Sequence, residues 1–361
     1  MEEKEQNEKE NPKKAVTPAF KFGIFGSSNP AAEDTPAPAP LFTSSEPKPA
    51  TAGRAWPIFQ ETPWRQLNWS DETRTALLES IRSYKPACDS VPAARVLLVG
   101  PVGAGKSSFI SSVQSVFYGR VLNRAMVGSS STSSGSFTKK LQSYQLHSSR
   151  ERDGGSMALV LSDMVGLGEA SSSLTLHDAL AAIKGHVPDG HTFSACSPVG
   201  SDTAGYVKEP TLAERVHCVA FVVSAPEIST YSKTMTSTLQ QLREHISALG
   251  VHQVALLTHV DKVCLKTAAD VSQVYRSTPL KNVMIQASAL LGMPISSMVP
   301  VKNYSEELDP EPHTDTLLLT ALELILQYVD FHLRDQSDQA HHAESSDHAE
   351  SSTAQRDPFH L

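Results

Sequence analysis

Eight consecutive residues of this chain, G-P-V-G-A-G-K-S at positions 100–107, match the phosphate-loop pattern G-x-x-x-x-G-K-[ST] in full. In such a loop the backbone N–H groups turn inward around a phosphate, at the positive end of the helix that follows. Lys106 is expected to neutralise the β- and γ-phosphates, and the Ser107 hydroxyl to bind Mg²⁺. The predicted phosphate-binding residues are Gly100, Val102, Gly103, Ala104, Gly105, Lys106, Ser107, Ser108 and, from a later segment, Gly166.

That later segment is the tetrapeptide D-M-V-G at 163–166, which follows the apolar run 157–161. Asp163 is expected to hold Mg²⁺ through a water, and the Gly166 N–H to contact the γ-phosphate. A further Mg²⁺ ligand is expected from the Gly- and Ser-rich loop after residue 118, in a segment that the ion and the γ-phosphate would order. Three residues of that loop qualify, with the first preferred: Thr132, Thr138 and Ser136.

The choice of base depends on T-H-V-D at 258–261, which follows the apolar run 254–257. GTP-binding proteins carry [NT]-K-x-D at this place, and the aspartate accepts two hydrogen bonds from guanine that adenine does not offer. Asp261 therefore favours GTP over ATP. His259 stands where lysine is usual, and its ring is expected to stack on the base instead. The predicted base-binding residues are Thr258, His259, Asp261 and, after the last strand, Lys302 and Asn303.

The residue after D-M-V-G bears on hydrolysis. Ras-like enzymes place a water-orienting glutamine there, whereas this chain has Leu167. No arginine finger is assignable from the sequence. We therefore expect bound GTP with Mg²⁺ to be hydrolysed slowly, or only with the help of a partner or of self-association.

The order of elements predicts the fold class. A buried strand precedes the phosphate loop and a helix follows it; an edge hairpin and repeated strand–helix units come next. Right-handed crossovers then give a three-layer α/β/α domain of the P-loop GTPase type, with a mostly parallel sheet and one antiparallel edge strand. The expected strands are 96–99, 141–147, 157–161, 216–223, 254–257 and 295–301; the expected helices start near Ser70 and after the phosphate loop, and lie at 174–184, 229–249, 267–276, 279–291 and 317–333.

Composition sets the domain limits and excludes some partners. Residues 1–55 read as a disordered leader, 62–334 as the nucleotide-binding domain, and 335–361 as a disordered polar tail. A net charge of −8 argues against nucleic acid as a partner. The 4 cysteines are scattered and form no C-x-x-C pair, which favours a reducing compartment. With a charged start and no long apolar run, we expect a cytoplasmic protein without a transmembrane segment.

Three stretches resemble one known family. They are residues 95–116, 215–222 and 254–261, within a similarity that covers roughly residues 62–333. The chain resembles the interferon-induced protein 44 and 44-like family. The resemblance implies a GTP-binding protein of the cytoplasm, induced in the innate immune and antiviral response. Some relatives carry a TLDc domain before this region, where the chain has only the leader, so we expect a form without that domain.

Two functions therefore compete. The first is a GTP-binding switch of the interferon response with slow or partner-dependent hydrolysis, which leaves open whether the protein is a weak GTPase. The second is an interaction or assembly protein whose nucleotide is structural and is not turned over. A third, an ATP-using P-loop enzyme, is disfavoured by Asp261.

Overall fold

The computed structural model describes residues 58–122, 138–148, 155–168, 174–194 and 196–354, with side chains described as far as residue 339. Residues Ala55–Leu361 form one compact unit, to which all of the described structure belongs. The leader predicted over residues 1–55 lies outside the described residues, so its disorder stays a prediction.

A sheet with the strand order β2-β3-β1-β4-β5-β6 runs through this unit. Strand β2 pairs antiparallel with β3 at one edge, and all other neighbouring strands pair in parallel. This topology confirms the predicted sheet with a single antiparallel edge strand among the described residues. The strands are β1 Ala94–Val99, β2 Gln142–His147, β3 Ser156–Asp163, β4 Cys218–Ser224, β5 His252–Thr258 and β6 Met298–Pro300.

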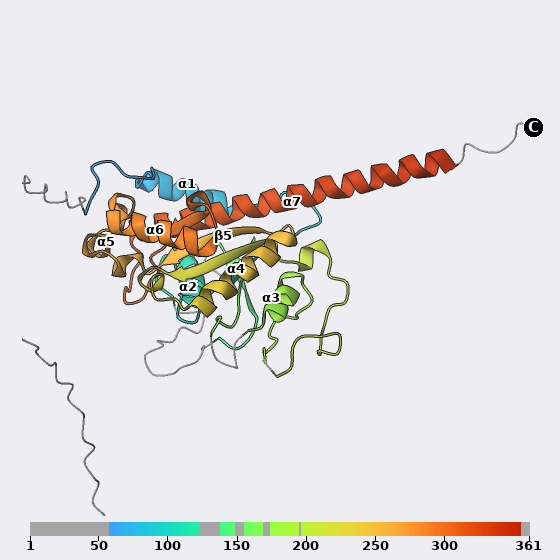
Figure 1. The fold of residues 1–361 in the computed structure, drawn as a ribbon. Helices are drawn as coiled ribbons and strands as arrows, with labels where there is room; N and C mark the ends of the chain where they lie inside the picture. Colours follow the sequence, from blue (N-terminus) through green and yellow to red (C-terminus); the bar gives the residue numbers. More distant parts are fainter. Residues whose placement is uncertain (1–57, 123–137, 149–154, 169–173, 195, 355–361) are drawn as a thin grey trace, which may run out of the picture. The chain divides into compact units, whose positions relative to one another are not determined.

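Helices cover both faces of the sheet (Figure 1). Alternate residues of a strand point to opposite faces, so in β1 Val96 and Leu98 join one buried cluster while Leu97 and Val99 join the other. Helices α1, α2 and α7 pack on the first face, and α3, α4 and α6 on the second, which confirms the three-layer α/β/α fold. The helices are α1 Asp71–Arg82, α2 Lys106–Tyr118, α3 Leu176–Ile183, α4 Lys233–Ala248, α5 Leu265–Ala269, α6 Thr278–Leu291 and α7 Pro312–Ala354.

Two predicted element boundaries are confirmed and two elements differ. The Ser70 side chain accepts a hydrogen bond from the Thr73 N–H and begins α1, and Gly292, at φ 64°, ends α6. The helix expected at 267–276 is instead α5 followed by a 3₁₀ segment, because extended Asp270 separates them. The strand expected at 295–301 begins as a 3₁₀ turn, which leaves only Met298–Pro300 in the sheet.

Helix α7 extends beyond its predicted end. The sequence predicts a helix to residue 333 and a tail from 335, whereas α7 continues to Ala354. The reason is that no glycine or proline follows Pro312 within the helix to interrupt it. Its segment Pro312–Gln339 is apolar and long enough to cross a membrane by length and composition alone, but the most apolar window is 61% buried in the domain. The absence of a transmembrane segment stays a prediction.

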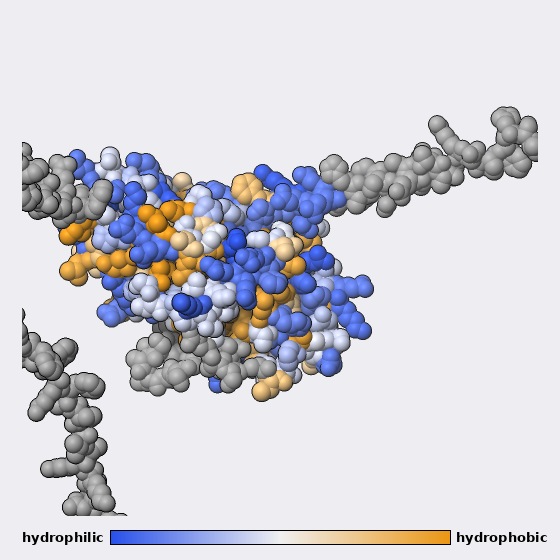
Figure 2. Space-filling model, viewed as in Figure 1, coloured by the Kyte–Doolittle hydropathy of each residue, from blue (hydrophilic) through white to orange (hydrophobic). Residues whose placement is uncertain are grey.

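The visible surface is mixed (Figure 2). Polar side chains cover much of α1 and the described end of α7, while apolar residues gather over α5 and α6. Leu265 in α5 and Ile285 in α6 are among the exposed large apolar side chains.

Candidate nucleotide-binding site

The predicted motifs meet at one edge of the sheet. Strands β3, β1, β4 and β5 are neighbours and parallel, so their carboxyl ends lie side by side. The phosphate loop follows β1, D-M-V-G begins at the last residue of β3, and T-H-V-D begins at the last residue of β5. The carboxyl edge of such a sheet is where ligands of open α/β folds bind.

Backbone geometry explains the glycines of the phosphate loop. Gly105 has φ 90° and caps the start of α2, a left-handed conformation that other residues rarely adopt. A Cβ atom on Gly100 would lie 2.0 Å from the Val222 carbonyl oxygen, because the loop leaves the sheet directly against β4. The loop therefore leads directly into the amino end of α2, where backbone N–H groups can bind an anion.

The Lys106 ammonium lies inside this loop. Its Nζ donates to the carbonyl oxygens of Gly100 and Pro101, each at 3.0 Å, and the residue is 6% exposed. Burial lowers the pKa of Lys106 to about 8, although the nearby Asp163 carboxylate opposes this shift. Among the described residues, the carbonyl oxygens of the loop and the Asp163 carboxylate offset the lost hydration of this ammonium.

Three oxygen-bearing side chains gather beside the loop. The Ser107 hydroxyl donates to Asp163 Oδ2, and the Thr138 hydroxyl donates to the same atom at 3.1 Å. The two hydroxyl oxygens are 3.2 Å apart. Burial raises the pKa of Asp163, which is 1% exposed, and its second oxygen, Oδ1, has no hydrogen-bond partner among the described residues.

This cluster fits a magnesium ion. Mg²⁺ prefers hard oxygen ligands such as carboxylates and hydroxyls. A buried carboxylate oxygen without a partner is costly, and a bound cation or an ordered water would satisfy it. Asp163 and Ser107 therefore stand where the sequence predicts Mg²⁺ ligands. Of the three loop candidates, Thr138 is placed beside them, while Thr132 and Ser136 lie outside the described residues.

The D-M-V-G segment is tied to the phosphate loop by a backbone ladder. The Leu167 N–H donates to Gly100 O at 3.0 Å, and the Val102 N–H donates to Leu167 O at 3.1 Å. We call these two bonds the Leu167 ladder. The Val102 N–H therefore has a protein partner, and its predicted contact with a phosphate stays a prediction. Gly166 packs so closely here that a Cβ atom on it would lie 2.8 Å from Val102 Cα.

In the predicted base-binding motif, Thr258 at the end of β5 contacts both the phosphate loop and the neighbouring strand β4. Its fully buried hydroxyl lies 2.7 Å from the Ala104 carbonyl oxygen and 3.1 Å from that of Val223. His259 has φ 55°, which makes it the single non-glycine residue with positive φ in the described ranges. Burial lowers the pKa of His259, with Lys262 adding to the shift and Asp261 opposing it. The ring is therefore neutral at physiological pH and suited to stacking.

The two predicted base-binding residues of the loop after β6 make different contacts. The Asn303 amide Nδ2 donates to Gly105 O at 3.1 Å, so this side chain touches the phosphate loop itself. Lys302 Nζ instead pairs with Glu307 Oε1 at 2.9 Å. Burial opposes ionisation of Glu307, but the Ser305 N–H and Lys302 outweigh it and lower the pKa of Glu307 to about 2. Asp261 lies half-exposed in a 3₁₀ turn directly after β5.

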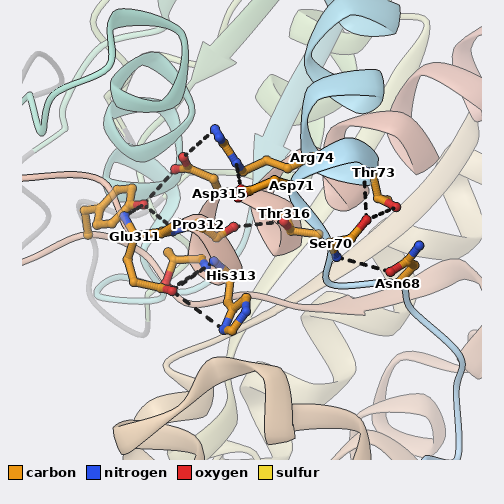
Figure 3. A network of polar contacts seen from close by, with 12 residues as sticks. Asn68, Ser70, Asp71, Thr73, Arg74, Glu311, Pro312, His313, Asp315 and Thr316 are labelled. Carbon is orange, nitrogen blue, oxygen red and sulfur yellow. Dashed lines mark hydrogen bonds and ion pairs between the residues drawn. The ribbon is translucent and has the colours of Figure 1, made fainter.

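A second layer behind the base loop was not predicted from the sequence. The Tyr304 N–H donates to Ser112 Oγ in α2 at 2.9 Å, and its hydroxyl donates to Asp315 Oδ1 in α7 at 2.7 Å. Asp315 Oδ2 in turn lies 3.7 Å from Nη1 of Arg74 in α1, in the network of Figure 3. Tyr304 and Ser112 are 192 positions apart in the chain, so no local sequence pattern predicts their contact.

The comparison with solved structures gives matches of low TM-score. They include Toc33 from Arabidopsis thaliana in complex with GDP and Mg²⁺ (TM-score 0.39, 15% identity, covering 72% of this chain and 90% of that chain). A probable GTP-binding protein engB (0.35, 13%, 65% and 98%) and a point variant of Aquifex aeolicus Era bound to GDP·AlF₄⁻ (0.32, 14%, 66% and 57%) also match. The fold assignment rests on the sheet order and layers described above.

The sequence comparison gives closer relatives, although no protein-family model matches the chain. The interferon-induced protein 44 of Homo sapiens is 35% identical over 271 residues, which are 75% of this chain. That of Mus musculus is 34% identical over 259 residues, or 72% of the chain, and the match covers 60% of the relative. The interferon-induced protein 44-like of Homo sapiens is 35% identical over 266 residues, 73% of this chain and 58% of the relative. The chain thus spans about 60% of the length of the curated relatives it matches. With this identity over three quarters of its residues, the chain belongs to the family of interferon-induced protein 44 and its 44-like relative.

Proposed function

We propose that this protein binds a guanine nucleotide, GTP or GDP, together with Mg²⁺ at the edge of the sheet described above. One observation carries the proposal. Ser107, Thr138 and Asp163 converge beside the phosphate loop, and a buried carboxylate oxygen of Asp163 lacks a partner among the described residues. When bound, Mg²⁺ would offset phosphate charge; the chain's own oxygens would hold it, and Lys106 would supply a second positive charge within the loop.

Asp261 supports guanine as the base. It lies in the 3₁₀ turn after β5, and the last residue of that strand, Thr258, contacts the phosphate-loop carbonyl of Ala104. A carboxylate there can accept hydrogen bonds from guanine N1–H and from its exocyclic amine, and adenine offers no such pair. The neutral His259 ring then takes the part of the usual lysine by stacking, while the backbone around Lys302 and Asn303 lines the far side of the base.

We propose that hydrolysis of GTP is slow unless a partner or self-association assists it. Leu167 occupies the position of the water-orienting residue, and it is 4% exposed and packed in the hydrophobic core. An apolar buried side chain neither accepts a proton nor orients a water. Unassisted turnover is therefore expected on the order of 10⁻⁴ per second, as for the intrinsic activity of Ras.

The biological setting is proposed from the relatives. Their names describe proteins induced by interferon, so we propose that this protein acts in the innate immune, antiviral response, in the cytoplasm. Its further partners are other proteins or a second copy of itself, and not nucleic acid, since the net charge is −8.

The alternative is an interaction or assembly protein whose nucleotide is structural. The Leu167 ladder favours it, because the D-M-V-G segment is held by backbone bonds that need no γ-phosphate. In that case nucleotide binding would stabilise the fold by mass action without any turnover.

Nucleotide titration tests the proposal. Fluorescent GTP and ATP analogues are titrated into the full chain with Mg²⁺, and into Lys106→Ala and Asp261→Asn variants. We expect GTP to bind more tightly than ATP, Lys106→Ala to abolish binding, and Asp261→Asn to move preference toward xanthosine triphosphate. Tighter binding of ATP than of GTP would overturn guanine recognition.

Single-turnover hydrolysis then separates the two functions. The rate is followed at several protein concentrations with GTP limiting. A rate that rises with concentration would support activation by self-association. No hydrolysis at any concentration, with tight binding retained, would favour the structural nucleotide.

A further inference from the structure

We infer that the protein has a second binding site, for a small organic carboxylate with an apolar body, at the edge of the sheet opposite to the nucleotide-binding site. This site is a cavity of about 260 Å³ lined by residues from the end of α3, from the segments before β4 and β5, and from α7. It is independent of the proposed GTP binding, because none of the described residues of the phosphate loop or of the base-binding motif lines it.

The cavity lies at the amino ends of two parallel strands. Val216 lies two residues before β4, and Val251 directly precedes β5. The nucleotide-binding motifs follow the carboxyl ends of strands of the same sheet. A strand of the length of β4 spans roughly 20 Å, so a ligand in the cavity would not touch a bound nucleotide.

The inner wall of the cavity is apolar. Ile183 and Val216 are buried and belong to the apolar cluster that α3 and α4 cover. Leu249 and Val251 pack against the same cluster and remain partly exposed. The volume is near the lower limit for ligand pockets, so the cavity suits one ring or a branched chain and is too small for a second nucleotide.

Positive side chains stand at the rim of this wall. Lys184 caps the end of α3, Arg215 lies shortly before β4, and both are exposed. Neither forms an ion pair among the described residues, and Arg215 uses only Nε within the chain, to donate to the Pro210 carbonyl oxygen at 3.1 Å. The described lining includes no acidic side chain, and Glu214, the neighbour of Arg215, is bonded to Thr211. The two terminal guanidinium nitrogens are thus available to a carboxylate.

The carboxyl end of α3 does not account for these cations. A helix end attracts positive charge through its unpaired carbonyl groups. Here the carbonyl oxygens of Ala181, Ala182 and Ile183 each accept a hydrogen bond of 3.0 or 3.1 Å from the backbone N–H of a later residue. Lys184 and Arg215 are therefore not needed to cap these carbonyls.

A buried histidine adds a polar group with an unused nitrogen. His332 of α7 lines the cavity and is 4% exposed. Its Nδ1 donates to the Gly250 carbonyl oxygen at 3.0 Å, and its Nε2 has no hydrogen-bond partner among the described residues. This nitrogen can accept a hydrogen bond from a ligand when the ring is neutral and donate one when the ring is protonated. A polar atom without a partner on so buried a side chain indicates a site that receives a ligand or a water.

These three features together select the class of ligand. The apolar wall favours burial of a ring or a branched chain. The rim favours a negative group, and a carboxylate offers one oxygen to Arg215 and the other to Lys184. A positively charged molecule would meet like charges there, and a neutral one would gain nothing from them.

Phenylacetate is the probe for this site, because it joins one ring to one carboxylate through a short chain. It is titrated into the full chain while the methyl NMR signals of Ile183, Val216 and Val251 are followed. Phenylacetamide and phenethylamine have a similar shape, and they are neutral and positively charged. We expect phenylacetate to shift these signals saturably and to bind at least about threefold more tightly than the amide, with the amine weakest.

Two substitutions test the rim. Lys184→Gln and Arg215→Gln each remove one positive charge and keep a polar side chain. We expect either change to weaken phenylacetate binding about twofold to threefold, and the double variant to bind phenylacetate no better than phenylacetamide. Lys85→Gln is the matched control, because Lys85 is an exposed lysine outside the cavity, and it should bind both probes as the wild type does.

Several outcomes would overturn the inference. They are the absence of saturable shifts at Ile183, Val216 and Val251, equal affinities of the wild type for phenylacetate and phenylacetamide, and a double variant that still prefers phenylacetate. If Arg215→Gln does not fold, the exposed position of Lys184 decides: Lys184→Gln must weaken phenylacetate and leave phenylacetamide unchanged. Titrations with and without GDP and Mg²⁺ should agree, so a failure of the proposed nucleotide binding would leave this result standing.

Discussion

The side-chain amide of Asn303 donates a hydrogen bond to the carbonyl oxygen of Gly105 at 3.1 Å, which links the loop after β6 to the last glycine of the phosphate loop. The approach is close: a Cβ atom on Gly105 would lie 2.9 Å from Asn303 Nδ2. We expect Asn303→Ala to weaken GTP binding by about tenfold, the worth of one such bond to a well-placed acceptor. Titration of the variant beside Glu306→Ala, an exposed residue of the same loop, measures this; equal affinities would show that the contact does not position the base loop.

The Mg²⁺ cluster predicts which loop threonine matters. Thr138 donates to Asp163 Oδ2, whereas Thr132 lies outside the described residues. Thr138→Val keeps the shape and removes the hydroxyl, so we expect nucleotide affinity in Mg²⁺ to fall toward the value measured in EDTA. Thr132→Val is the matched variant and should keep its full Mg²⁺ dependence. If Thr132→Val and not Thr138→Val lost its Mg²⁺ dependence, the Mg²⁺ ligand would be Thr132, which the sequence analysis prefers.

Lys106 predicts a pH dependence of nucleotide binding. Burial lowers its pKa to about 8, and a bound phosphate would stabilise the ammonium and raise that pKa again. Above pH 8 binding must then take up a proton, so affinity should fall as pH rises, by about tenfold between pH 7 and pH 9. Titrations of GDP over this range check it. Lys106→Arg stays charged throughout and should show a flat profile; an equal fall in that variant would assign the effect to another group.

Asp315 predicts a pH dependence of stability. Burial raises its pKa from an ordinary 3.8 to about 6, although Tyr304 and Arg74 oppose the shift. A carboxyl with a raised folded pKa contributes stability that is complete below pH 3.8 and is lost as pH rises through 6. The loss from this group amounts to about 3 kcal/mol. Urea unfolding between pH 4 and pH 7 should therefore show that the free energy of unfolding of Asp315→Asn rises relative to that of the wild type as the pH increases. Parallel pH profiles of the two proteins would contradict this prediction.

The contact of Gly166 with Val102 predicts a packing defect. A methyl group on Gly166 would meet the Val102 backbone at 2.8 Å, where backbone atoms have little room to yield. We expect Gly166→Ala to lower the free energy of unfolding by about 1–3 kcal/mol. The matched change is Gly155→Ala, since a Cβ atom there would meet no described atom within 4 Å. Denaturant unfolding of both variants measures the difference, and similar losses would contradict the close approach.

Much of the fold follows from local patterns in the sequence. The buried strand before residue 100, the helical spacing of Phe109 and Val113 after the loop, and the Ser70 cap each depend on neighbouring residues alone. Alternating strands and helices then leave right-handed crossovers as the ordinary topology. The sequence predicts too short a helix α7 because the polar composition after residue 335 is typical of a tail, although no glycine or proline there interrupts the helix.

By itself, the sequence determined the phosphate loop, Asp163, and the base motif ending in Asp261, because each motif follows its own strand and is read within a few residues. Only the tertiary structure brought Thr138 to Asp163, since the loop that carries the threonine has no periodicity from which its path could be predicted. It also revealed the Leu167 ladder and the Tyr304–Asp315–Arg74 network, whose members are far apart in sequence. The physical reason is that hydrogen bonds and packing between distant segments depend on how the sheet aligns its strand ends, and the sequence encodes that alignment only through the whole fold.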